Sequence, residues 1–318
     1  TEYYNRLTFW EEIFEKIQSG NYKSPRMDEA QKIIDDFRER PQTYHIINKP
    51  QKNTIQRFKQ IKFILPKNLW KNFIFLSQMA FRKRDYSEER LDWFLIDRIK
   101  RKIRSIIGYD DIFENPKDNE DFCFFPLNAE PEITLYLYAP FRLNQIETAR
   151  QIAKSLPVGF KLYVKDHPIM YGYRTRRYYK ELKKIPNVRV INSQISGYEI
   201  MRKAKLVTTI SGTAGWEATV LKKPVITFGD VFYNKLSMVK HCKTPEELPF
   251  LIKERLRNFK HNEEELINFL SAILEESVNI DFLDLWLEER NFEKIKNDNG
   301  TKQLASLIAQ KIELGKLQ

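Results

Sequence analysis

Between residues 133 and 228, short apolar runs alternate with amphipathic segments. The runs have the length and the β-branched and aromatic content of strands, and the segments between them repeat apolar residues at helical spacing. Strands and helices that alternate through short loops form right-handed βαβ units and a parallel sheet. The pattern predicts strands at 133–139, 160–164, 188–191, 205–210 and 224–228, and helices at 143–156, 174–185, 196–204 and 213–222.

The remaining parts of the chain have helical rather than strand-like patterns. Apolar residues recur at helical spacing within 5–18, 27–40, 87–107, 244–275 and 301–314. We therefore expect three parts: a mainly helical N-terminal region at 1–120, a doubly wound, Rossmann-like α/β domain at 121–245, and C-terminal helices at 246–318.

Composition narrows the class of protein. The 318 residues are 42% hydrophobic and 31% charged, which is typical of a globular chain. The two cysteines are far apart, so we expect neither a disulfide framework nor a zinc site made of cysteines. Such sparse cysteines are consistent with a reducing compartment, and we expect a cytoplasmic location. The net charge of +11 suits nucleic acid, anionic lipid or phosphorylated substrates. Motifs of nucleic-acid binding are lacking, so we do not expect a nucleic-acid partner.

Ligands of doubly wound sheets bind outside the carboxyl ends of the strands. The sequence VKDHP, at 164–168, follows one predicted strand. Lys165 and His167 alternate along the chain, so they share a direction while Asp166 points away, and Pro168 holds His167 extended. Two potential cations there would suit a phosphate leaving group. A histidine buried in the core is the alternative interpretation.

A second polar loop, TTISGTAGWE at 208–217, follows another predicted strand. Gly212 permits close approach of the backbone to a ligand, and Ser211 and Thr213 add hydroxyl groups at a helix N-terminus that favours phosphate. Glu217 lies one helical turn beyond Thr213 and could accept hydrogen bonds from sugar hydroxyls. Alternatively, Ser211 only caps the helix and Glu217 is only solvated.

Three carboxylates are candidates for a general base or for contact with the donor. Glu130 and Glu132 flank Pro131 just before the first predicted strand, and either could deprotonate an acceptor hydroxyl. Asp230 follows the last predicted strand and could face a donor, although Gly-Asp is also common in turns. A solvated loop is the alternative interpretation of the two glutamates.

Three stretches together resemble the capsule polysaccharide biosynthesis family of glycosyltransferases, which are Kdo-transferase-like members of the GT-B superfamily. They are FFPLNAEPEITLY, YVKDHP and TISGTAGWEATVLKKPVITFG, within about 120–235. The resemblance implies a GT-B fold in which His167, Ser211 and Thr213 hold the donor phosphate and Glu217 lies near the ribose. It also implies an N-terminal acceptor domain, which either precedes Thr1 or is absent.

The expected function is therefore transfer of a sugar from a nucleotide-activated donor to a capsule polysaccharide, surface polysaccharide or glycolipid. By resemblance the first donor to test is CMP-Kdo and the second a uridine-diphosphate sugar, with no cofactor or metal. A nucleotide-sugar epimerase and a non-catalytic nucleotide-binding scaffold of polysaccharide export are the alternatives. The basic aromatic segment 81–105 is either a solvated helix face or a surface that contacts an anionic inner membrane.

Overall fold

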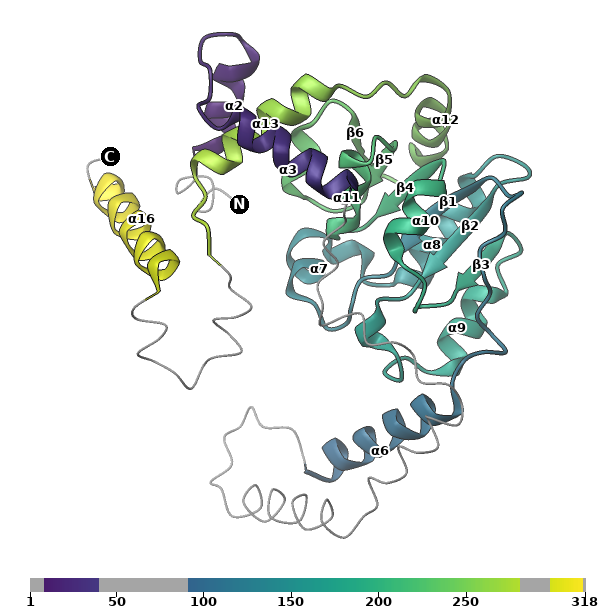
Figure 1. Ribbon diagram of the computed structural model, residues 1–318. Helices are drawn as coiled ribbons and strands as arrows, with labels where there is room; N and C mark the ends of the chain where they lie inside the picture. Colours follow the sequence, from purple (N-terminus) through teal and green to yellow (C-terminus); the bar gives the residue numbers. More distant parts are fainter. Residues whose placement is uncertain (1–8, 40–90, 281–297, 317–318) are drawn as a thin grey trace. The chain divides into compact units, whose positions relative to one another are not determined.

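The computed structural model describes residues 9–39, 91–280 and 298–316 (Figure 1). The chain divides into two compact units. One comprises Gln42–His261, and the other combines the two ends of the chain, Thr1–Pro41 and Asn262–Gln318. Each unit is described by itself below.

The larger unit contains a six-stranded sheet in which every neighbouring pair is parallel. The strand order β3-β2-β1-β4-β5-β6 is that of dinucleotide-binding domains, in which the connections reverse direction between β1 and β4. The expected α/β fold with a doubly wound parallel sheet is confirmed. Its strands are β1 (Phe122–Pro126), β2 (Lys161–Lys165), β3 (Val188–Ile191), β4 (Leu206–Thr209), β5 (Val225–Thr227) and β6 (Val239–His241).

Helices cover both faces of this sheet, so nearly every residue of its central strands is buried. Helix α8 contacts β2, α9 contacts β3, and α12 packs on α8, whereas α10 contacts β1 and α11 contacts β4 and β5. Right-handed crossovers place α8 and α9 on one face and α10 and α11 on the other. Their bounds are α8 (Gln145–Ser155), α9 (Arg176–Lys183), α10 (Gly197–Lys203), α11 (Thr213–Val220) and α12 (Leu248–Asn258).

The strand predicted at 133–139 is wrong. This stretch forms a short helix, α7 (Ile133–Tyr138), followed by the 3₁₀ turn η2 (Pro140–Arg142). Only Leu135 of α7 is buried, so the apolar side chains of this stretch do not line a sheet. The first strand is instead β1, whose sequence FCFFP was not predicted as a strand, and β6 was also missed. Glu130 and Glu132 consequently follow β1 at its carboxyl end instead of preceding the first strand.

The other predicted strands and the helices between them are confirmed to within a few residues, and β3 has the predicted bounds. Helix α6 (Leu91–Ile107) corresponds to the predicted helix at 87–107, of which residues 87–90 lie outside the described ranges. In the C-terminal part, the pattern at 244–275 corresponds to α12 and α13 (Glu263–Glu275) and that at 301–314 to α16 (Asn299–Lys316).

The smaller unit joins the two ends of the chain. Its helices α2 (Trp10–Gln18) and α3 (Met27–Glu39) both pack on α13. The ring of Phe269 meets the rings of Trp10 and Phe14 edge-on, each with centroids 5.3 Å apart. Arg38 also forms an ion pair with Glu263. The unit therefore has its own apolar core, to which both ends of the sequence contribute.

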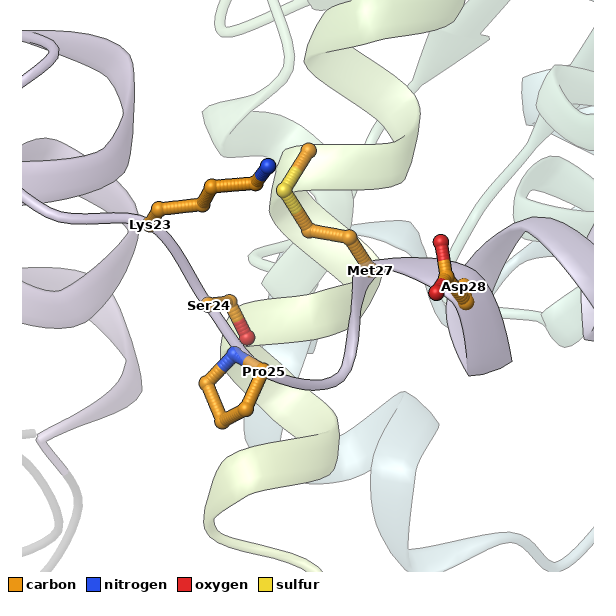
Figure 2. Close-up of a pocket in the computed structure, with 5 residues that line it drawn as sticks. All are labelled: Lys23, Ser24, Pro25, Met27 and Asp28. Carbon is orange, nitrogen blue, oxygen red and sulfur yellow. The ribbon is translucent and has the colours of Figure 1, made fainter.

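This unit also contains a hollow of about 280 Å³ (Figure 2). The residues around it come from the connection between α2 and α3 and from the first turn of α3, and they are Lys23, Ser24, Pro25, Met27 and Asp28. None of the sequence-predicted site residues lines it, so it does not enter the description of the candidate site.

Candidate functional site

The loops that leave β1 and β4 meet at the point where the strand order reverses. Asn128, in the loop after β1, connects them, because its Nδ2 donates to Ser211 Oγ at 3.2 Å and to Glu132 Oε2 at 3.3 Å. The loop after β2 approaches the same place through Arg174, whose Nη2 donates to the carbonyl oxygen of Asn128 at 2.7 Å. The structure thus brings three strand-end loops together at the edge where ligands of such sheets bind.

Asp166 is a structural carboxylate. Its side chain is 2% exposed and accepts hydrogen bonds from Arg174 Nη1 at 2.9 Å, from the Tyr179 hydroxyl and from the His167 amide at 2.8 Å. Burial raises the pKa of Asp166, against the opposing effects of Arg174 and Tyr179. These contacts with Arg174, Tyr179 and the His167 amide hold the loop after β2 in place.

Lys165 is a buried cation that forms no ion pair with the described carboxylates. It is 7% exposed, and the hydrogen bond found for its Nζ goes to the carbonyl oxygen of Asp166 at 3.4 Å. Burial lowers the pKa of Lys165 to about 8, with only a partial offset from the charge of Asp166. The ammonium group is still mostly protonated at pH 7, so this position favours an anion.

His167 is a neutral hydrogen-bond donor rather than a second cation. It has the expected extended backbone, with φ −63° and ψ 132°, and Pro168 begins the short turn η3 (Pro168–Met170). Its Nδ1 accepts the Ile169 amide at 3.3 Å, which leaves the proton on Nε2. Burial, followed by the positive charge of Lys165, lowers the pKa of His167. The imidazole therefore presents an Nε2–H group close to a cation.

The N-terminus of α11 has backbone groups available for a ligand. Gly212 is its N-cap and supplies no side-chain bond, and the Ser211 hydroxyl instead meets Asn128. The Gly212 amide donates to Thr209 Oγ1 at 3.2 Å, and the Tyr233 hydroxyl donates to the Gly212 carbonyl at 2.6 Å. These bonds fix the loop, while the first amides of the helix keep the capacity to bind an anion.

Glu217 resembles Lys165 but has the opposite charge, because it forms no ion pair with a cation in the described parts of the chain. The predicted proximity to Thr213 is confirmed, because Thr213 Oγ1 donates to Glu217 Oε1 at 3.3 Å. Burial raises the pKa of Glu217, and this hydrogen bond lowers it only in part. A partly desolvated carboxylate with one long hydrogen bond can accept more from the hydroxyl groups of a ligand.

The two glutamates of the β1 loop differ in their surroundings. Glu130 accepts a hydrogen bond from Gln145 and lies 3.3 Å from Arg174, so its charge is compensated by the protein. Glu132 accepts from Asn128 and from Thr134 Oγ1 at 2.6 Å, and it has no ion pair with the described cations. Its charge also opposes the lowering of the His167 pKa, which places it near that imidazole.

Asp230 is at the same edge of the sheet but is exposed and is not joined to this cluster. Its amide donates to the carbonyl of Tyr138 at 2.8 Å. Within the described ranges, no group of three or more His, Cys, Asp or Glu side chains could hold a metal ion.

Several residues that organise the site were not predicted from the sequence. Gln145 clamps the β1 loop by accepting from the Asn128 amide at 2.8 Å and donating to the Asn128 carbonyl at 3.1 Å. Arg174 is buried, yet it lies in the basic stretch RTRR, where nothing distinguishes one arginine from its neighbours. The position of Asn128 directly after a buried apolar run was the available signal, and it was lost with β1.

Comparisons with known proteins find similar solved structures and one matching family model. A search of curated proteins gives no match. Similar solved structures include two from Thermosulfurimonas dismutans. One is the KpsC beta Kdo 2,7 transferase, with 19% identity and a TM-score of 0.36, covering 62% of this chain and 57% of that one. The other is the KpsC beta Kdo 2,4 transferase, with 18% identity and a TM-score of 0.34, covering 58% and 56%.

A glycotransferase of kitacinnamycin is also similar, with 18% identity and a TM-score of 0.34, covering 50% of this chain and 41% of that one. The chain thus spans little more than half the length of the first two of these proteins. The family model described as capsule polysaccharide biosynthesis protein matches residues 21–243, which is well over half of the chain and includes both polar loops. The chain therefore belongs to the capsule polysaccharide biosynthesis protein family.

Proposed function

We propose that this protein is a glycosyltransferase that moves a sugar from a nucleotide-activated donor to a capsule polysaccharide, surface polysaccharide or glycolipid acceptor. One observation carries the proposal: buried Lys165, the last residue of β2, and half-buried Glu217, in α11, have opposite charges and no ion pair among the described residues, and both belong to elements at the edge where the strands end. A nucleotide sugar has anionic phosphate and neutral hydroxyl groups, which such a pair can bind separately.

The donor phosphate would bind Lys165, the Nε2–H of His167 and the first amides of α11, with Ser211 and Thr213 beside them. These are fixed donors in a partly buried place, where hydrogen bonds to developing charge are strong. Gly212 lets the loop pass close to Thr209, since a Cβ there would lie 3.1 Å from Thr209 Oγ1. Glu217 would accept hydrogen bonds from the ribose.

In the transfer step, the acceptor oxygen forms a bond to the anomeric carbon as the bond from that carbon to the phosphate oxygen breaks. The bonding electrons leave with the phosphate, whose charge Lys165 and His167 stabilise, and the acceptor proton passes to a carboxylate. We assign that proton to Glu132 ahead of Glu130, because Glu130 is already engaged by Arg174 and Gln145. Pro168 would act indirectly by holding His167 extended, and Asp230 remains a weaker candidate for donor contact.

Membership of the capsule family makes CMP-Kdo the first donor to test and a uridine-diphosphate sugar the second. With a nucleotide-sugar donor, we place the reaction in the cytoplasm. The epimerase and the non-catalytic scaffold make different predictions for the purified protein. Transfer requires an acceptor and releases the nucleotide, epimerisation changes the donor sugar without release, and a scaffold binds nucleotide without chemistry.

Calorimetric titration of the full chain with cytidine and uridine nucleotides is the direct test of the donor site. We expect Glu217→Gln to weaken binding by on the order of tenfold or more, since it replaces charged hydrogen bonds. Glu130→Gln should leave nucleotide binding nearly unchanged. Lys161→Met should also leave it unchanged, because Lys161 lies at the opposite end of β2 from Lys165. Equal losses in Glu217→Gln and Glu130→Gln, or no binding of either nucleotide at millimolar concentration, would refute the assignment.

A further inference from the structure

Helix α6 contacts the rest of its unit through its polar face. Arg104 Nη1 donates to the carbonyl oxygens of Gly172 and Tyr173, at 3.3 and 2.7 Å, and the Arg101 guanidinium lies 3.9 Å from the centre of the Tyr173 ring. A Cβ at Gly172 would lie 3.3 Å from Ser105 Cβ, so the backbone of the loop approaches the helix closely. Arg101, Arg104 and Ser105 share one face, as their spacing of three and four residues requires.

The opposite face of α6 is apolar and exposed. Its isoleucines follow one another at intervals of three or four residues and are 49% to 61% exposed, and they are Ile96, Ile99, Ile103 and Ile107. Amphipathic helices of globular units normally bury this face and expose the charged one. In α6 the arrangement is inverted, because the polar face makes the contacts with the unit and the isoleucine face stays exposed.

Charge indicates which kind of partner. Between Ile96 and Ile107 the helix has five basic residues and one acidic residue, Asp97, which pairs with Arg101 on the polar face. The exposed Lys100 lies at the edge of the isoleucine face. An apolar stripe on a basic helix, bordered by an exposed lysine, complements a bilayer with anionic headgroups, whose surface is anionic and whose interior is apolar.

We propose that α6 docks this protein on an anionic membrane surface, with the isoleucine face between the headgroups and Lys100 among the lipid phosphates. The helix would lie in the plane of the interface. No helix in the described parts of the chain is both long and apolar enough to cross a bilayer. This inference does not depend on the proposed donor chemistry.

Docking through α6 would also orient the candidate site. The loop that receives Arg101 and Arg104 continues directly into Arg174, which holds Asp166 and the Asn128 carbonyl. The docked helix and the strand-end loops are thus linked by one short, well-bonded segment. A site fixed in this way at a membrane would meet acceptors that are attached to lipid.

The test is flotation of the purified full chain with two kinds of vesicle, one of phosphatidylcholine alone and one with about a third phosphatidylserine. We expect binding to the anionic vesicles only. Ile99→Asn combined with Ile103→Asn should lower the partition coefficient at least tenfold, and Lys100→Glu should lower it by roughly fivefold or more. The controls are Val158→Asn and Lys154→Glu, which change exposed residues elsewhere in the same unit and should bind like the wild type.

Three results would overturn the proposal. The wild type could fail to float with anionic vesicles, which would mean that another part of the chain or a protein covers the isoleucines. The α6 variants could bind like the wild type. Light scattering could show a dimer that Ile99→Asn dissociates, which would identify a second copy as the partner. Nucleotide binding of the same preparations, measured without vesicles, should be unchanged in every variant and reports separately on the donor site.

Discussion

At the scale of single residues, the candidate site depends on charged groups that form no ion pair with any residue the structure describes. Lys165 is the clearest example, because a buried ammonium group destabilises the folded chain unless it pairs with an anion. The protein retains this cost at a strand end, next to an imidazole whose pKa is lowered by burial and then by the charge of Lys165. A place where stability is sacrificed in this manner is more typical of binding than of packing.

Replacing Lys165 by Met should therefore stabilise the protein while weakening nucleotide binding. The folded-state pKa is lowered to about 8, below the value of the unfolded chain, so the charged form is disfavoured by folding. The gain should be roughly 1–3 kcal/mol below pH 8 and should shrink as the pH rises from about 8 toward the unfolded pKa. Thermal unfolding at several pH values measures it.

Binding should show the reverse dependence on pH. Since the phosphate requires protonated Lys165, nucleotide affinity of the wild type should fall as the pH rises above about 8. Lys165→Met should bind more weakly at every pH and lose this dependence, and Lys161→Met should retain it. A wild-type affinity that stays constant from pH 7 to pH 9 would contradict the role of Lys165.

His167→Ala should preserve the fold and lose turnover. If Nε2–H donates to the leaving phosphate, its contribution grows as charge develops, and such donors contribute roughly 100- to 1000-fold in rate. A core histidine would instead lower the melting temperature and reduce activity only with the folded fraction. His167→Gln, which keeps an amide donor, should lose less activity than His167→Ala. Melting temperature and turnover, measured on one preparation, distinguish the two roles.

At the scale of elements, the sequence predicted the strand-end loops well because their polar residues interrupt strong apolar runs. It failed at 133–138, where ITLYLY has the β-branched and aromatic residues of a strand. In the folded chain this stretch forms a helix, and of its residues only Leu135 is buried in the core. The real strand, FCFFP, is too short and uniformly apolar to show an alternating pattern.

That error also hid the function of the β1 loop. With β1 unrecognised, Asn128 and Gln145 could not be connected to Ser211, and Glu130 and Glu132 could not be told apart. Arg174 and Tyr179 could not have been found from periodicity, because their roles depend on burial around Asp166, a residue eight or more positions away. Spacing predicts which side chains share a strand or helix face, but not which of several charged residues is buried.

The α11 loop is held by close packing that a single methyl group should disturb. A Cβ at Gly215 would lie 2.5 Å from the Tyr233 hydroxyl, the group that donates to the Gly212 carbonyl. Gly215→Ala should therefore displace Tyr233, destabilise the chain by about 1–3 kcal/mol and weaken nucleotide binding. Gly197→Ala in α10 is the matched control, because nothing lies within 4 Å of a Cβ there. Calorimetry measures nucleotide binding by both variants, and thermal unfolding measures their stability. Equal affinity and stability of the two variants would show that the loop tolerates the added methyl group.

At the scale of the whole molecule, the two ends of the chain build one unit and the residues between them build the other. The smaller unit has its own aromatic core, where Trp10 and Phe14 meet Phe269. The larger unit has the candidate site and a separate apolar core around its sheet. Because each core is internal to its unit, local unfolding of one need not unfold the other.

Phe14→Ala should therefore destabilise the smaller unit alone. The side chain is 8% exposed and packs on Phe269, so its removal leaves a cavity that should cost roughly 3 kcal/mol. Hydrogen exchange measured by mass spectrometry should show faster exchange in α2, α3 and α13, with unchanged protection in β1, β2 and β4. Ile33→Ala, at an exposed position of α3, is the control and should alter neither region. Loss of protection in the central strands of Phe14→Ala would mean that the two units unfold as one, and nucleotide binding by the variant should then fall together with its stability.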